Sequence, residues 1–200
     1  MKKYKIIKSI SKKANGSRVD LIYNDDISSY CILAVIPEKE LDDSPQLLKS
    51  LIGHSSPYIA KIYDVCLEKD KVYIVEEYVK GKTLGTILRE KAEINQEQWR
   101  EWEFQITKGL LCLHTMQPQP LLHGDIHPDN IIIDYVNQAK LIDFSSIKSH
   151  NQLFRRRVHA VREFLDPRIL KGFPYDNRAD FYSLGKVMNL FNEKAKDEVK

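Results

Sequence analysis

The stretch that decides the fold is LLHGDIHPDNIII, residues 121–133, and LIDFSSIK follows it at residues 141–148. Asp125 and Asn130 are five residues apart between two apolar runs, and Asp143 comes thirteen residues after Asn130. One carboxylate at this spacing can orient an attacking hydroxyl, while the other carboxylate and the amide oxygen can hold Mg²⁺ against phosphates. The full set of residues therefore favours phosphoryl-transfer chemistry over a merely polar turn.

The composition is that of a globular domain, with 200 residues and a formal net charge of +3. That charge is too small to indicate nucleic-acid binding, although six lysines lie within the first thirteen residues. No apolar run has the length of a membrane span, and no secretory signal is recognised. Cys31, Cys66 and Cys112 show no metal-binding spacing and are expected to be reduced core cysteines. We expect a cytoplasmic protein that binds neither nucleic acid nor membrane.

The first third of the chain alternates short β-branched and aromatic runs with turn signals. These runs predict about five strands in a meander, at residues 4–10, 18–24, 29–36, 58–68 and 71–79. Between the third and fourth runs, SPQLLKSLIG predicts a short helix. Ser44 is its expected N-cap, Pro45 its first residue, and Gly53 lies just beyond its end.

The apolar period changes after the strands. One helix face is formed by Trp99, Trp102, Ile106, Leu110 and Leu113. Asn95, with Gln98 three residues later, suits the start of that helix, and a last helix is expected from about Ala179. We therefore predict an α+β fold with a small antiparallel-sheet lobe at residues 1–80 and a short, mainly helical lobe at residues 81–200.

This arrangement resembles the protein kinases over nearly the whole chain. HGDIHPDN matches the family motif H-R-D-x-x-x-x-N, and DFS matches D-F-G. VYIVEEYVKGKTL is similar to the last strand of the kinase small lobe and the hinge, and FLDPRIL stands where the family has A-P-E. RADFYSLGKVM is similar to the helix that carries a buried aspartate, here Asp180. The catalytic loop also resembles that of aminoglycoside and choline phosphotransferases, which share the fold.

The resemblance implies a role for each polar residue of the loop. Asp125 is expected to be the catalytic carboxylate, and Asn130 and Asp143 are the expected Mg²⁺ ligands. His127 stands where the family has a lysine beside the catalytic aspartate, and we count it among the catalytic candidates. In small-molecule phosphotransferases this histidine is a common residue of the loop.

The resemblance also places ATP between the lobes, with its adenine at the backbone of Glu77 and Val79. The other nucleotide-binding candidates are Lys13, Gly16, Val19 and Ile132. The family stacks four side chains between its lobes, which here are Leu48, Ile62, His123 and Phe144.

The departures from the family pattern gather on the nucleotide side. The Gly-rich loop keeps only its third glycine, and its three positions hold Ser11, Lys13 and Gly16. The lysine of V-A-I-K falls on Ala34, or on Ile36 in a register moved by two residues. The glutamate that pairs with this lysine falls on Ser44, so both partners of the ion pair are lost.

The second half departs as well. Gly124 replaces the arginine that reads a phosphorylated activation loop, and Ser145 replaces the glycine of D-F-G. Val161 replaces a threonine, and Arg168 replaces the A-P-E glutamate, whose usual arginine partner lies in a region that this sequence does not contain. Arg155, Arg156 and Arg157 have two interpretations: they bind an acidic partner, or they are a solvated run of charges.

Three functions follow from these patterns. The first is a degenerate kinase domain that acts through a regulatory protein partner and binds nucleotide weakly or needs no cofactor. The second is an active serine/threonine kinase that uses ATP, Mg²⁺ and a protein substrate, with the missing cation supplied by Lys13 or Arg18. The third is a small-molecule phosphotransferase, which the kinase-like activation segment disfavours.

Overall fold

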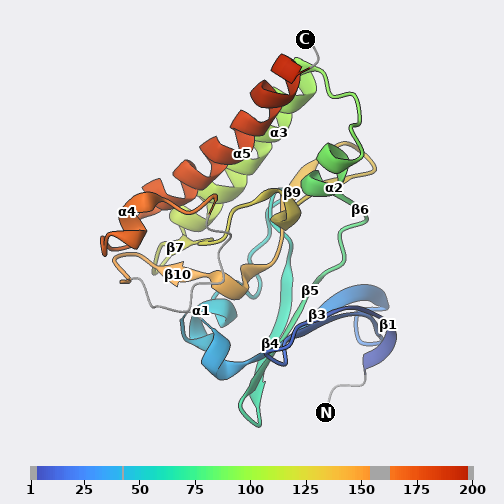
Figure 1. The fold of residues 1–200 in the computed structure, drawn as a ribbon. Coiled ribbons are helices and arrows are strands. Elements are labelled where there is room, and N and C mark those ends of the chain that lie inside the picture. Colours follow the sequence, from blue (N-terminus) through green and yellow to red (C-terminus); the bar gives the residue numbers. More distant parts are fainter. Residues whose placement is uncertain (1–3, 42, 154–162, 198–200) are drawn as a thin grey trace.

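The structure is a computed structural model that describes residues 4–41, 43–153 and 163–197. Val161 and the arginines at 155–157 therefore lie outside the described residues. The N-terminal part is one antiparallel sheet in the order β1-β2-β3-β5-β4 (Figure 1). Its strands are β1 Tyr4–Lys12, β2 Arg18–Asn24, β3 Ser29–Pro37, β4 Ile62–Glu68 and β5 Lys71–Glu77.

All five predicted strands form, but the expectation of a simple meander is wrong. Strand β5 pairs with β3, and β4 lies at the edge of the sheet. The burial pattern explains the exchange, because Val72 and Val75 of β5 are buried, whereas β4 ends in exposed residues. Cys66 lies in that exposed end and is therefore not a core cysteine. Lys69 and Asp70 connect the two strands in a tight turn with positive φ angles.

A short connection leads from β3 to β4. It contains the 3-10 turn η1 (Glu38–Glu40) and the helix α1 (Pro45–Lys49). Pro45 is the first helical residue, as predicted, and Ser44 occupies the N-cap position without a capping hydrogen bond from its side chain. Pro45 and Leu48 are the buried residues of α1, and Leu48 is fully buried. With five residues, α1 is less than two turns long.

The C-terminal part is mainly helical. Helices α3 and α5 run side by side at the end of the molecule away from the sheet (Figure 1), and Trp99 stacks on Phe191 between them at 5.0 Å. Asn95 caps α3 by accepting a hydrogen bond from the Gln98 backbone at 2.8 Å, as predicted. The elements are β6 Gly81–Thr83, α2 Leu84–Arg89, α3 Gln96–His114, β7 Leu121–Leu122, η2 Pro128–Asn130, β8 Ile131–Asp134, β9 Ala139–Leu141, η3 Phe144–Ser146, β10 Lys148–Ser149, α4 Pro167–Leu170 and α5 Asn177–Asp197.

One hydrophobic core joins the sheet to the helices. Leu48, Ile62 and Phe144 belong to the same buried cluster, and the Phe144 ring lies 5.3 Å from the ring of His123. The predicted α+β fold of the kinase type is confirmed, while a boundary at residue 80 stays a prediction. Among the helices that the structure describes, none combines the length and apolar character that a membrane span requires.

Two helix glycines test this packing. A Cβ added at Gly109 of α3 would lie 2.9 Å from the Tyr58 carbonyl oxygen and 3.1 Å from Leu141 Cδ1, whereas one added at Gly185 of α5 meets nothing within 4 Å. We expect Gly109→Ala to lower the free energy of unfolding by about 1–3 kcal/mol through overpacking. Gly185→Ala should raise it by about 0.5–1 kcal/mol through helix propensity. Urea unfolding compares the two variants, and equal effects would contradict the packing.

Candidate active site

A cleft of about 540 Å³ lies between the strands of the sheet and the loops that follow β7 and β9. This volume is typical of a small-molecule site. The predicted site residues that line the cleft are Lys13, Val19, Glu77, Val79, Asp125, His127, Asn130, Ile132 and Asp143. Gly16 is not one of the lining residues, and it lies in the β1–β2 turn with a φ of 91°. Gly16 therefore allows the positive φ angle of the turn.

The loop after β7 sets the position of Asp125. The turn η2 brings Asn130 back so that its Nδ2 donates to the Asp125 carbonyl oxygen at 2.9 Å and lies 3.4 Å from Asp125 Oδ2. His127 Nε2 lies 3.7 Å from the same carboxylate, and its Nδ1 accepts from the Asp129 backbone N–H. Because the Asn130 amide nitrogen is directed at Asp125, the Asn130 amide oxygen remains for a ligand.

Asp143 follows β9 in a strained conformation, with a φ of 61° and a ψ of 80°. Its carboxylate accepts a hydrogen bond from the Ser145 backbone N–H at 3.2 Å. The next side chain, Phe144, is buried on His123, so the turn directs Asp143 and Phe144 to different environments. Ser145 has no positive φ angle, and this backbone therefore does not need the glycine of the family motif.

A buried carboxylate on α5 holds the start of the catalytic loop. Asp180 accepts backbone N–H groups from His123 and Gly124, both at 2.9 Å, and His114 Nε2 lies 2.8 Å from it. Burial acts to raise the pKa of Asp180, but the hydrogen bond and charge of His114 and the Gly124 amide lower it below its ordinary value. Burial lowers the pKa of His123 and favours its neutral ring.

A buried lysine occupies the space beside Gly124. The Lys148 ammonium donates to the Ser146 carbonyl oxygen at 2.8 Å and lies 5.0 Å from the centre of the Tyr175 ring. A Cβ added at Gly124 would lie 2.5 Å from the same carbonyl oxygen and 2.9 Å from Lys148 Nζ. The structure therefore has no room at residue 124 for the family's arginine.

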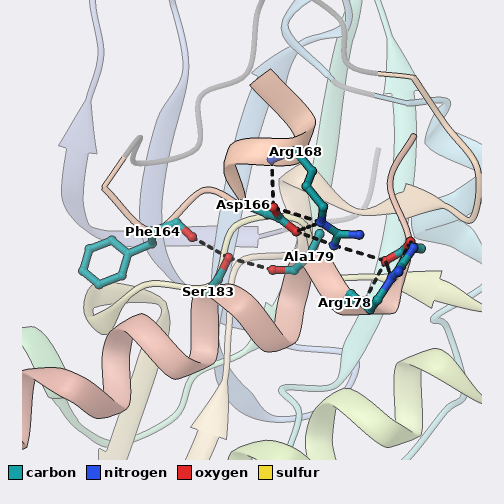
Figure 2. Close-up of polar contacts among 7 residues, drawn as sticks. Phe164, Asp166, Arg168, Arg178, Ala179 and Ser183 are labelled. Atoms are coloured by element: carbon teal, nitrogen blue, oxygen red, sulfur yellow. Dashed lines mark hydrogen bonds and ion pairs between the residues drawn. The ribbon is translucent and has the colours of Figure 1, made fainter. Parts of the chain in front are cut away.

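The segment that resembles A-P-E is anchored by ion pairs of Arg168, which stands where the family has a glutamate. Arg168 Nε donates to Asp166 at 2.9 Å and its guanidinium also lies 3.7 Å from Asp176, which in turn accepts from Arg178 (Figure 2). The family's arginine partner is thus replaced by two nearby aspartates. Asp166 is 2% exposed and also caps α4 by accepting the Arg168 backbone N–H.

A serine on α5 also holds the segment that resembles A-P-E. Ser183 Oγ lies 2.7 Å from the Phe164 carbonyl oxygen and 3.0 Å from the Ala179 carbonyl oxygen (Figure 2). Because Ser183 is buried and one turn from Asp180, α5 fixes both the catalytic loop and the end of the activation segment.

The family's lysine has no replacement on β3. The cleft face of this strand carries Ile32, Ala34 and Ile36, so both candidate registers place an aliphatic side chain there. Ser44 is exposed at the start of α1. Lys13 and Arg18 are the long cations among the described lining residues, and Arg18 Nε lies 3.0 Å from Asp20. That ion pair leaves Lys13 as the better candidate for a relocated cation.

The sequence reasoning missed Glu76. The residue lines the back of the cleft and is 7% exposed. Burial, followed by the negative charge of Asp143, raises the pKa of Glu76 to about 8, and the Asp143 backbone amide partly opposes the rise. The period of two in VYIVEE already places Glu76 on the same face as Ile74, while Glu77 points to the opposite face and pairs with Lys140 at 2.7 Å.

The sheet, the catalytic loop and the aspartate-anchored helix together make a kinase-like domain. Residues 30–195 match the family model of the protein kinase domain, so the chain belongs to the protein kinase family. It is 33% identical to a probable serine/threonine-protein kinase of Clostridium perfringens over 67% of this chain and 20% of that protein. It is 29% identical to the human serine/threonine-protein kinase Nek5 over 94% of this chain and 27% of that protein.

A third relative is the dual specificity mitogen-activated protein kinase kinase 1 of Dictyostelium discoideum, which is 28% identical over 92% of this chain and 28% of its own length. The chain therefore spans 20–28% of the length of these relatives.

The two D-x-R pairs give a matched test of the anchor. Arg168→Gln leaves the buried Asp166 carboxylate, whose side chain is 3% exposed, without its guanidinium. We expect the free energy of unfolding to fall by about 1–3 kcal/mol, less than for a fully buried pair because Arg168 is 34% exposed. Arg178→Gln removes the equivalent contact from a side chain that is 72% exposed, and the loss should stay below about 1 kcal/mol. Thermal unfolding of both variants measures the difference, and a larger loss in Arg178→Gln would refute it.

Proposed function

We propose that this chain is a protein-kinase domain that binds Mg²⁺ and ATP weakly, transfers phosphate at most slowly, and acts mainly by contact with a protein partner. The proposal rests on a difference between the two sides of the cleft. Asp125, Asn130 and Asp143 are gathered in one cleft, yet Ala34 lies where the family's lysine would neutralise phosphate.

The residues present fit a magnesium ion and a nucleotide. The Asp143 carboxylate and the Asn130 amide oxygen are hard oxygen ligands on the same cleft, and they are the groups that would hold Mg²⁺. When bound, Mg²⁺ supplies positive charge to the phosphate oxygens. Val19 and Ile132 give the cleft apolar walls for a base, and the backbone of Glu77 and Val79 supplies hydrogen-bonding groups at its edge.

The loss of the strand lysine is expensive for catalysis. Removing one positioned group that stabilises transition-state charge costs about 2.7–4 kcal/mol, or about two to three orders of magnitude in rate. Side chains at Ser11 and Lys13 further limit how closely the loop backbone can approach phosphate. These losses leave a scaffold with nucleotide-binding groups and little transition-state stabilisation, which favours a binding role.

A second candidate is an active serine/threonine kinase. Lys13 supports it, because this residue lines the cleft and forms no ion pair within the described residues. Asp125 would then orient the hydroxyl group of a protein substrate, and Lys13 would replace the strand lysine. The similarity to serine/threonine-protein kinases favours a protein over a small molecule as the substrate.

Thermal unfolding with millimolar ATP and Mg²⁺ tests nucleotide binding. A ligand at ten times its dissociation constant stabilises by about 1.4 kcal/mol, which corresponds to a rise in melting temperature of about 3–6 °C for a chain of this size. We expect a rise of this order, lost in Asp143→Asn because a Mg²⁺ ligand is removed. Asp125→Asn should keep the rise, since this carboxylate serves the hydroxyl. An unchanged melting temperature of the unmodified protein would refute nucleotide binding.

Phosphate transfer from labelled ATP to a generic protein substrate separates the two candidates. The proposal predicts that the unmodified protein and Asp125→Asn transfer label at the same low rate. Transfer that disappears in both Asp125→Asn and Lys13→Ala would instead establish the active kinase with Lys13 as its cation. Thermal unfolding of each variant serves as the control for folding.

A further inference from the structure

One edge of the sheet is open along most of its length. Strand β1 is the end strand of the five, and in the part of the chain that the structure describes it pairs with β2 alone (Figure 1). Every residue of β1 after Tyr4 is exposed, including Ile6 at 54% and Ile7 at 45%. Among the described residues no strand lies beyond the outer side of β1, and such a row of backbone N–H and C=O groups is a template for a further strand.

The opposite edge of the sheet has a different character. Strand β4 begins with the buried Ile62, which forms a bridge to Ile52, and Val65 is buried as well. The charged residues of β4 are the acids Asp64 and Glu68. Strand β1 is therefore the edge that is both exposed and basic.

The positive charge of β1 is local and is not neutralised by the sheet. The strand carries Lys5, Lys8 and Lys12 and no acidic residue. None of these lysines forms an ion pair within the described residues, and the acid opposite β1 in the strand register, Asp20, is already paired with Arg18 at 3.0 Å. Because the whole chain has a formal net charge of only +3, this charge distinguishes the edge from the rest of the surface. We refer to residues 5–8 with Lys12 as the basic edge.

Charge and backbone groups together select one class of partner. A second copy that paired its own β1 here would bring lysines opposite lysines, which is destabilising. A nucleic acid or an anionic membrane offers negative charge, but it offers no alternation of hydrogen-bond donors and acceptors at the spacing of a strand. An extended polypeptide offers that alternation, and acidic side chains on it would meet the lysines. The basic edge therefore fits an acidic segment of another protein.

Two bulges limit the length of the segment that can pair. The register between β1 and β2 shifts between Ile6 and Lys8 and again between Ser9 and Ser11. Bulges bend and twist a strand, which disfavours the addition of a long flat strand and protects the edge from indiscriminate pairing. A short segment beside residues 5–8 fits this geometry, and its selection depends on charge.

We propose that the basic edge is the docking surface for a short, acidic, extended segment of a partner protein. The segment adds to the sheet beside β1, its backbone bonds to the outer N–H and C=O groups, and its carboxylates face Lys5 and Lys8. The inference rests on the proposed function, because it names the surface and the chemistry of the partner contact. Ile10 and Ser11 of the same strand line the nucleotide cleft, so the docked segment would lie next to the mouth of that cleft.

The test uses a fluorescein-labelled peptide of alternating Glu and Val, whose binding to the full chain is followed by fluorescence anisotropy. We expect binding that weakens as the salt concentration rises. The double variant Lys5→Glu with Lys8→Glu should weaken binding by at least about tenfold, because two opposite-charge pairs across the strands become like-charge pairs. The matched control is Lys61→Glu with Lys71→Glu, which changes the net charge equally at exposed residues outside β1 and should leave the affinity unchanged.

A second peptide tests the backbone pairing. The same sequence methylated at alternate backbone nitrogens keeps every carboxylate but loses the hydrogen-bond donors of one edge, so it should bind at least about tenfold more weakly. Equal binding of the two peptides would refute strand pairing. No binding of the acidic peptide by the unmodified protein would overturn the proposal. Capture of the chain by phosphatidylserine vesicles through Lys5 and Lys8, without peptide binding, would also overturn it and make the basic edge a membrane contact.

A milder variant keeps the proposal testable if the charge reversal fails to fold. Lys5→Gln with Lys8→Gln removes both charges without adding acids, and we expect it to weaken binding of the acidic peptide by about twofold or more. The melting temperature of each variant reports its folding. Unchanged affinity in a folded Lys5→Gln, Lys8→Gln protein would count against the basic edge.

The results also separate this inference from the function on which it rests. Peptide binding that depends on Lys5 and Lys8, in a protein whose phosphate transfer is fast and is lost in Asp125→Asn, would support the docking surface and refute a function based mainly on binding. An ATP-dependent rise in melting temperature with only slow transfer, in a protein that does not bind the acidic peptide, would support the proposed nucleotide site and refute the docking surface.

Discussion

The carboxylate of Asp180 is the contact on which the catalytic loop depends. It is 2% exposed and accepts two backbone N–H groups from the turn at His123 and Gly124, while His114 faces it from α3. These donors hold its pKa below the ordinary value. A depressed pKa means that the network contributes in full above the ordinary value of 3.8 and is lost as the pH falls through the folded value. At neutral pH the loop is therefore bound to α5 by a charged anchor.

The positions of two further features depend on Asp180. His123 packs on Phe144, and Phe144 fixes the turn in which Asp143 faces the cleft. Ser183, one turn along α5 from Asp180, holds the Phe164 carbonyl oxygen at the end of the activation segment. The lost lysine and two lost glycines lie on the sheet side of the cleft, while Gly124, a departure within the catalytic loop, still donates its backbone N–H to Asp180. The chain has therefore kept its C-terminal framework while its phosphate-facing strand changed.

Local patterns in the sequence predicted the elements, because each depends on neighbouring residues. The period of α3, the Asn95 cap and the proline of α1 were all visible in the sequence. The exchange of β4 and β5 was not, since strand order depends on which strand the core can bury on both faces. The new partners of Arg168 were also hidden, because they depend on how the A-P-E-like segment folds back toward Asp176. The roles of the cleft residues stay predictions.

The pKa of Glu76 shows why electrostatic properties are difficult to predict from a sequence. Period two alone places it on the cleft face, but its altered pKa arises from burial and from Asp143, which is 67 residues away in sequence. An acid buried among aliphatic neighbours is costly unless a cation or a proton neutralises it. Since Ala34 offers no cation beside Glu76, the fold accommodates this carboxyl through the Asp143 backbone amide and through a raised pKa that favours its protonated form.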